Sequence, residues 1–251
     1  MRPHKCEYWL TSKDKLEAPE VYDEAVQNLC ATYLQAPALS DEGTRVVSVD
    51  EKTGMQALER VHPTKPMRPG TPERIEFEYK RHGTMCLIAT WDVTRGGILG
   101  YTLGATRTEQ DFANHIERCI DKTPCGGWVF VCDQLNTHMS ESLVKVVAKR
   151  CSIDVDLGRK EEHGILRSMA TRKAFLADPS HRIRFVYTPR HASWLNQIEI
   201  WFSILARKLL RRSSFDSLDA LRERIEKFIE YFNTVLAKPF RWTYTGRALQ
   251  A

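Results

Sequence analysis

The sequence predicts an α/β protein whose core is a mixed sheet of five strands flanked by helices. Arg45–Asp50 and Trp128–Asp133 are short apolar runs with little alternation, as in strands that are buried on both faces. Met85–Val93 and Ile98–Leu103 are separated by a turn with two glycines, which is a hairpin pattern. A fifth strand is expected at Ile183–Thr188. Helical segments lie between the later strands, and this order favours a mixed sheet with crossover helices.

Helical spacing of apolar residues predicts the elements between the strands. A first helix follows Pro19 and closes near Pro37 and Gly43. Thr108 and Asp111 have the spacing of a capping box at the start of a second helix. The remaining helices are expected from Ser140 to about Arg150, over 168–177, after Asn196 as N-cap, and from Ser217 to about Leu236.

Two long stretches lack these patterns. Residues 52–83 hold several prolines and glycines, and we predict a long loop there, of the kind that is often functional in compact domains. Residues 151–182 mix many charges with a few apolar positions, and we predict an insertion that contains one short helix.

The composition is that of an ordinary globular protein. Its 251 residues suffice for a large core, and 42% of them are hydrophobic and 27% charged. No apolar run approaches the roughly 18–20 residues that cross a membrane, and the N-terminus lacks the apolar segment of a secretory signal. The seven cysteines include no Cys-x-x-Cys pair, so a reducing cytoplasm is expected rather than a disulfide framework or a zinc ribbon. The net charge of +5 permits a nucleic-acid partner without requiring one.

Two of the buried strands end in an aspartate, Asp50 and Asp133. The carboxyl ends of strands are where the chemistry of open α/β sheets collects. If the two strands are parallel neighbours, the carboxylates lie close together and repel each other unless a proton or a cation sits between them. Carboxylate oxygens are the ligands that Mg²⁺ prefers. A two-metal site needs a further acid, and Glu199, in the first turn of an apolar helix, is placed to supply it.

Each of these acids also has a structural interpretation. A lone aspartate at a strand end usually caps a turn, and an acid in the first turn of a helix is favoured by the helix dipole. Two such aspartates with a matching glutamate favour the metal site. Glu51 and Asp92 are the competing acids, and Asp92 is predicted to begin the turn that follows it.

The local sequences around the three acids resemble those of a known family. The matching pieces are Ser48-Val-Asp50-Glu-Lys, Cys132-Asp133-Gln-Leu-Asn-Thr-His138, and Thr188-Pro-Arg-His-Ala-Ser-Trp-Leu-Asn-Gln-Ile-Glu199. They are similar to the DDE transposases of the mariner-like superfamily, in particular its bacterial insertion-sequence branch. The resemblance covers about residues 41–250 and implies a ribonuclease-H-like fold.

The resemblance also implies a function. Asp50, Asp133 and Glu199 would be the catalytic triad and would bind two Mg²⁺ ions, for which Mn²⁺ would substitute. The chain would nick DNA at transposon ends and direct a 3′-hydroxyl into target DNA, in the bacterial cytoplasm near the nucleoid. Relatives act as dimers, so a homodimer is expected by analogy.

The chain departs from the family pattern in two places. Asp133 and Glu199 are further apart than in many relatives, and the excess matches the insertion at about 151–182. The chain also begins near the linker, without the helix-turn-helix region of its relatives, which suggests a truncated copy or a separate N-terminal DNA-binding chain. The expected division is a linker and N-terminal helix at 1–40, a catalytic domain at 41–212, and a C-terminal helix with a basic and aromatic tail at 213–251.

Several other residues are candidates for contact with DNA. His138 would touch a phosphate or orient an acid, and a loop histidine bonded to backbone is the alternative. Trp194 would stack on a base, although such a residue more often packs. The cations near the end of its helix are candidates for phosphate contacts, or form a solvated helix end; they are Arg207, Lys208, Arg211 and Arg212.

Two alternative functions stay open at this point. One is a truncated remnant that binds DNA without catalysis. The other is a nuclease of the same fold that hydrolyses DNA but does not join ends.

Overall fold

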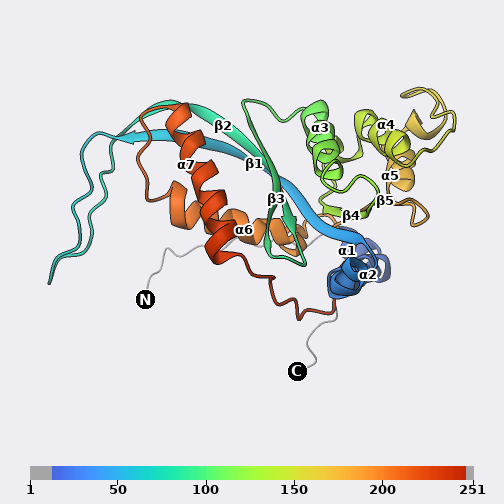
Figure 1. Ribbon diagram of the computed structural model, residues 1–251, viewed down its shortest axis with the longest axis horizontal. Helices are drawn as coiled ribbons and strands as arrows, with labels where there is room; N and C mark the ends of the chain where they lie inside the picture. The colour runs from blue at the N-terminus through green and yellow to red at the C-terminus, as the bar shows by residue number, and fades with distance from the viewer. Residues whose placement is uncertain (1–12, 247–251) are drawn as a thin grey trace.

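The computed structural model describes residues 13–246, which form one five-stranded sheet with helices on both faces (Figure 1). The strands are β1 (Thr44–Arg60), β2 (Tyr79–Asp92), β3 (Gly97–Gly104), β4 (Gly127–Cys132) and β5 (Ile183–Tyr187). Their order in the sheet is β3-β2-β1-β4-β5. β1, β2 and β3 pair antiparallel, whereas β1, β4 and β5 pair parallel. The predicted mixed sheet is therefore confirmed.

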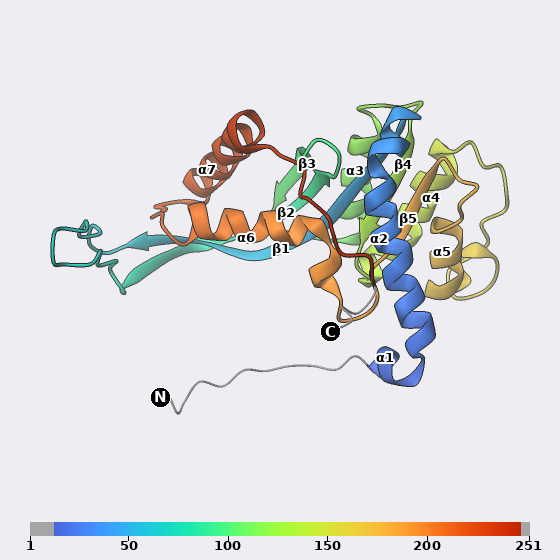
Figure 2. The ribbon, with the colours of Figure 1, turned by 90° about the horizontal axis from the view of Figure 1, so that it is seen from below.

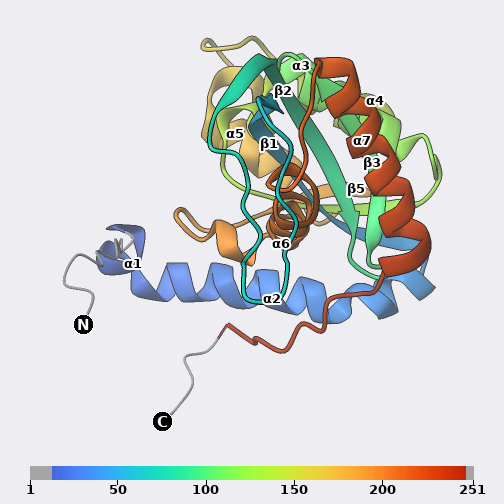
Figure 3. The same ribbon diagram turned by 90° about the vertical axis from the view of Figure 1, so that its left-hand side faces the viewer.

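Helices cover each face of this sheet and bury a separate apolar cluster against it. The helices are α1 (Lys13–Glu17), α2 (Pro19–Asp41), α3 (Glu109–Ile120), α4 (Glu141–Arg150), α5 (Met169–Leu176), α6 (Gln197–Leu205) and α7 (Leu218–Tyr231). α3, α4 and α5 cover one face. α2, α6 and α7 cover the other, and Figure 3 shows α6 nearly end-on above α2. Of the helices in the described part, none is long and apolar enough to span a membrane.

The alternation of β1 decides which side chains face which cluster. Val46 lies in the cluster beneath α2 and α6, whereas Val47 and Val49 lie in the cluster beneath α3 and α4. Because successive side chains of a strand point to opposite faces, Asp50 and Glu51 also point to opposite sides of the sheet.

The prediction of a loop over residues 52–83 is wrong at both of its ends. β1 continues to Arg60, and β2 already begins at Tyr79. The two strands project from the domain as an arm (Figures 1 and 2). The extension is stable because Met55 and Ala57 are buried on one face, and because Phe215 N donates to Leu58 O at 2.8 Å. The prolines are confined to the exposed connection between the two strands.

Pro37 does not end the first helix, contrary to the prediction. It lies inside α2, which continues to Asp41. The helix closes at Gly43, whose φ of +82° is a conformation that suits glycine. The predicted caps of the next helices are confirmed, since Thr108 and Asp111 form a capping box and Ser140 accepts from Leu143 N.

The segment 151–182 packs on the domain next to β5. Several of its apolar side chains, including buried Leu166 and Leu176, belong to the cluster beneath α4. The short helix that we predict there is α5.

Side chains occupy the free edge of β3. The Asn233 side chain accepts from Ile98 N at 2.8 Å and donates to Ile98 O at 2.9 Å. Lys122 donates to Leu99 O, and Arg222 donates to Leu103 O at 3.3 Å. Polar backbone groups at this edge are therefore already bonded within the chain.

Candidate active site

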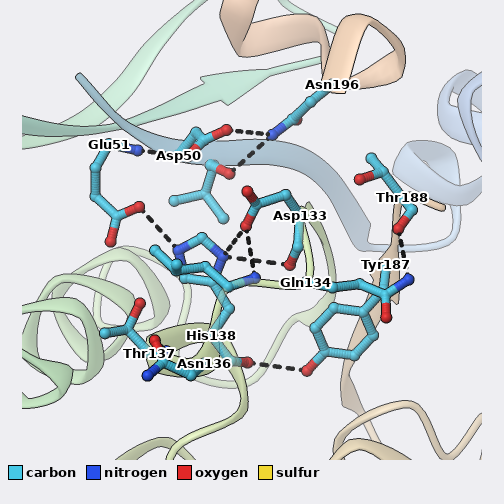
Figure 4. Close-up of polar contacts among 12 residues, drawn as sticks. Asp50, Glu51, Asp133, Gln134, Asn136, Thr137, His138, Tyr187, Thr188 and Asn196 are labelled. Carbon is cyan, nitrogen blue, oxygen red and sulfur yellow. Dashed lines mark hydrogen bonds and ion pairs between the residues drawn. The ribbon is translucent and has the colours of Figure 1, made fainter. Parts of the chain in front are cut away.

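Asp50 and Asp133 lie just beyond the paired part of two neighbouring parallel strands. The pairing of β1 with β4 ends at Ser48 and Val131, and each aspartate follows two residues later, Asp50 within β1 and Asp133 just past the end of β4. Asp50 is only 7% exposed. Figure 4 shows the two carboxylates side by side. The sheet topology therefore brings together the two acids that the sequence places at strand ends.

Asn196 holds the Asp50 carboxylate. Its Nδ2 donates to Asp50 Oδ2 at 3.0 Å and to Val49 O at 3.2 Å, and its Oδ1 accepts from the Ser48 hydroxyl. The side chain of Asn196 therefore does not cap α6, contrary to the prediction. The Ser48 Oγ accepts from Ile198 N at 2.8 Å instead, so a strand residue caps the first turn of the helix. This network fixes the start of α6 against residues 48–50 of β1.

His138 lies behind the two aspartates, in a 3₁₀ helix at Asn136–Met139. Its Nδ1 is 2.7 Å from Asp133 Oδ1, and its Nε2 is 3.0 Å from Glu51 Oε2 (Figure 4). The His138 and Glu51 side chains are 0% and 1% exposed. A contact of His138 with DNA is therefore not supported by the structure, which favours the other predicted role, that of orienting an acid.

Glu199 reaches the same site from the first turn of α6. Its side chain is half-buried, and this burial raises its pKa above the usual value. Lys52 attracts the charged form of Glu199, whereas the negative charge of Asp133 opposes it. The charge of Asp133 also raises the pKa of Asp50. The three predicted acids therefore belong to one electrostatic site.

The protonation of the site reflects this crowding. Burial, and then the charge of Asp133, raise the pKa of Asp50 to about 7. Burial opposes the charged form of Asp133, but the hydrogen bond and charge of His138 prevail and lower its pKa. Burial also disfavours a charged His138, but its hydrogen bonds, led by that to Asp133, raise its pKa well above the ordinary range. The site holds more carboxylates than one cationic side chain neutralises.

The donor set fits a divalent cation. Oxygen atoms of carboxylates are the ligands that hard divalent cations take. Ligand atoms of Asp50, Glu51 and His138 lie within 4.8 Å of one another. Both ring nitrogens of His138 face carboxylate oxygens, so the ring offers no lone pair, and the acids are the candidate ligands. Glu51 Oε1 is buried and accepts no hydrogen bond within the part of the chain that the structure describes.

The other predicted site residues lie on the surface. Trp194 is 57% exposed, and its ring centroid is 5.6 Å from that of Tyr244. The four cations after α6 are all exposed, in and beyond a π-helical turn at Ala206–Leu210; they are Arg207, Lys208, Arg211 and Arg212. The exposure of Trp194 and of the four cations is compatible with the predicted contacts with DNA, which stay predictions.

The competing acids have separate places. Asp92 begins a turn, as predicted, because its Oδ1 accepts from Thr94 N and Arg95 N at 3.0 and 2.9 Å. Glu51 belongs to the site, and sequence reasoning missed its contact with His138. The sequence contains only a weak indication of this contact. Glu51 follows Asp50 directly in the strand, so its side chain points to the opposite face of the sheet.

Comparisons with known proteins agree with this geometry. The model of a family described as DDE superfamily endonuclease matches residues 45–222. The fold is similar to a chain of the Mos1 mariner paired-end complex with Mn, at 15% identity and a TM-score of 0.55, over 98% of this chain and 68% of that one. It is also similar to the catalytic domain of Mos1 mariner transposase, at 13% identity and a TM-score of 0.53, over 98% of this chain and 100% of that one. The same domain with Raltegravir and Mg gives 13% identity, a TM-score of 0.53, and coverage of 97% and 100%. No curated protein matches the sequence.

Proposed function

The chain belongs to the DDE superfamily endonuclease family, and from this premise we propose that it is a transposase catalytic domain that cleaves DNA and transfers the cut strand. The proposal is supported by the placement of Asp50 in β1, of Asp133 just after β4 and of Glu199 in the first turn of α6, and by the charge of Asp133, which acts on both other acids. In the first step a water oxygen attacks phosphorus and the 3′-oxygen leaves. In the second step the freed 3′-hydroxyl attacks a phosphorus of target DNA, loses its proton, and displaces the 3′-oxygen of the target strand, which leaves as a hydroxyl.

Asp50, Asp133 and Glu199 are the proposed ligands of two Mg²⁺ ions, for which Mn²⁺ would substitute. Bound ions at such a site lower the pKa of the attacking oxygen and stabilise the leaving oxygen. The chain orients its own ligands in advance. Asp50 Oδ2 accepts from Asn196, and Asp50 Oδ1 accepts from Glu51 N at 2.8 Å. Asp133 Oδ1 accepts from Leu135 N at 2.9 Å and contacts His138, which leaves its Oδ2 for a ligand role.

DNA is the proposed partner. Several of the similar structures are complexes of Mos1 transposase, and one contains a left transposon end. Trp194 is proposed to stack on a base, and the four cations after α6 to contact phosphates. A homodimer and a separate N-terminal DNA-binding chain are part of the same proposal, as is the division into 1–40, 41–212 and 213–251.

Nicking of supercoiled plasmid by the purified chain tests the function. Wild type is incubated with Mg²⁺ or Mn²⁺ beside Asp133→Asn and beside Asp92→Asn, which changes a buried strand-end acid outside the site. We expect nicking by the wild type and by Asp92→Asn, and none by Asp133→Asn. Nicking by Asp133→Asn at the wild-type rate would refute the assignment. If the wild type does not nick, the DNA-binding remnant gains support.

A second assay separates a transposase from a nuclease of the same fold. A labelled DNA with a free 3′-hydroxyl is incubated with plasmid, the chain and Mn²⁺. Joining of the label to plasmid supports strand transfer. Nicking without joining supports hydrolysis alone.

A further inference from the structure

The two aspartates of the site lie beyond the paired part of β1 and β4, Asp50 within β1 and Asp133 just after β4. The pairing of β1 with β4 stops at Ser48 and Val131. Beyond that point, a chain of side chains connects the strands: Glu51 on β1, His138, and Asp133 after β4 (Figure 4). The function proposed above gives Glu51 no role.

Each contact in this connection is short and buried. Glu51 Oε2 lies 3.0 Å from His138 Nε2, and His138 Nδ1 lies 2.7 Å from Asp133 Oδ1. The Glu51 and His138 side chains are buried, whereas that of Asp133 is 36% exposed. The series of contacts therefore begins in the interior and ends at the solvent-accessible acid site. A change at Glu51 therefore reaches Asp133 through one intermediate ring.

The ring of His138 is fixed by its other neighbours. The centroid of Phe112 lies 4.1 Å from that of His138, and the Tyr187 hydroxyl donates to His138 O at 3.0 Å. The His138 N also donates to Leu135 O at 3.0 Å. Because backbone and ring are both held, His138 transmits position from Glu51 to Asp133.

One carboxylate oxygen of Glu51 is committed to His138. Asp50 points toward Asn196 at the start of α6, where Glu199 also lies. Glu51 is the next residue of the strand, and it points to the opposite face, where it meets His138. Its carboxylate still lies within 4.8 Å of ligand atoms of Asp50 and His138, but its Oε2 is the oxygen that contacts His138 Nε2.

We propose that Glu51 is a positioning residue that acts through His138 to hold the Asp133 carboxylate with one oxygen turned toward the metal ligands of α6 and β1. The inference rests on the function proposed above. Partners of this kind behind a ligand fix its orientation, and their loss lowers metal affinity by about 10–100-fold.

Mn²⁺ binding, measured by the EPR signal of the free ion, tests the role of Glu51 without reference to cleavage. Three variants separate position from charge. Glu51→Gln keeps an oxygen at the same reach, Glu51→Asp keeps the charge but is one methylene shorter, and Glu51→Ala keeps neither. We expect Glu51→Gln to bind Mn²⁺ within about threefold of the wild type, and the other two to bind at least about tenfold more weakly.

A matched control lies further along the same strand. Glu59 on β1 contacts His82 on β2, with Oε2 2.8 Å from Nε2, on the surface of the arm. Glu59→Ala removes the same kind of contact away from the acids, and we expect wild-type Mn²⁺ affinity. Urea unfolding of each variant confirms that the compared chains are folded, and Glu51→Asp with Glu51→Gln suffices if Glu51→Ala does not fold.

The outcomes distinguish this inference from the proposed function. Wild-type affinity in both Glu51→Asp and Glu51→Ala overturns the positioning role. Loss of affinity in Glu51→Gln with retention in Glu51→Asp also overturns it, because charge rather than reach would then matter. A wild type that neither binds Mn²⁺ nor nicks plasmid overturns the proposed function, and this inference with it.

Discussion

Two buried histidines, His115 and His138, differ in their partners and therefore in their charge. They are 1% and 0% exposed, on the same side of the sheet. His115 Nε2 and Nδ1 each lie 2.8 Å from a hydroxyl, those of Thr90 and Thr102. His138 meets the carboxylates of Glu51 and Asp133.

Burial acts on both rings in the same direction, but the outcome is opposite. Burial, together with the nearby cations Arg118 and Lys122, lowers the pKa of His115 to about 3. The hydrogen bonds to carboxylates outweigh burial for His138 and raise its pKa well above the ordinary value. One ring thus belongs to the neutral core, and the other is the cation of an acidic site. Burial alone does not tell a structural histidine from a functional one.

His138→Ala should give the largest effect. It leaves Glu51, whose side chain is 1% exposed, as a buried charge without its cation. Loss of one partner from a buried ion pair costs about 3–5 kcal/mol, which urea unfolding at pH 7 measures. We also expect loss of plasmid nicking, because Asp133 loses its support. A cost below about 1 kcal/mol would contradict a buried ion pair between His138 and Glu51.

The pH dependence of unfolding should separate the two rings by sign. The pKa of His115 is about 3 when folded and about 6.5 when unfolded, so its stability contribution is full above pH 6.5 and is lost as pH falls. The stability advantage of wild type over His115→Gln should shrink by about 2 kcal/mol between pH 6.5 and pH 5. The folded pKa of His138 is raised, so the sign is reversed for this ring. The stability advantage of wild type over His138→Gln should be full below about pH 6.5 and should decline as pH rises through the folded pKa. Equal slopes for both variants would contradict the comparison.

Thr90→Val should show what a neutral partner contributes. The change keeps the shape of the side chain but leaves His115 Nε2 without its hydroxyl. An unsatisfied buried group costs about 1–3 kcal/mol, measurable by urea unfolding. The rate of nicking per folded molecule should match the wild type, because Thr90 lies outside the acid site. A parallel loss of nicking would connect His115 to the function after all.

Glu59→Gln should give the smallest effect. The contact of Glu59 with His82 has the same chemistry as that of Glu51 with His138, but the two side chains are 35% and 31% exposed. Pairs at the surface contribute about 0.2–1 kcal/mol, so the change in unfolding free energy should stay below about 1 kcal/mol. A larger cost would show that the arm depends on this pair for its stability.

The sequence could predict those acids of the site that lie at the end of a recognisable apolar run or at the start of a recognisable helix. Asp50 and Asp133 each end an apolar run, and strand periodicity with a parallel pairing is enough to bring them together. Glu199 follows from the helix that begins nearby. The matched family model and the similar folds confirm the family and the mixed sheet that these residues indicate.

The remaining features depend on contacts between distant segments. Asn196 has the sequence signature of an N-cap, but Ser48 replaces it there because the two residues meet across the fold. The arm is missed because its buried positions, Met55 and Ala57, are covered by elements much later in the chain. Pro37 is compatible with α2 because the helix buries one face, including Tyr33 and Ala36 next to the proline, and this packing outweighs the local propensity of proline.

The occupied edge of β3 bears on how this chain behaves at high concentration. An open edge strand is a template on which another molecule adds a strand and begins an aggregate. Asn233 already saturates both backbone groups of Ile98, and Lys122 and Arg222 take two further carbonyl oxygens. Two of these three side chains carry positive charge, which also repels an identical approaching edge. These four backbone groups of β3 are thus occupied by side chains of the same chain and are not free to pair with an added strand.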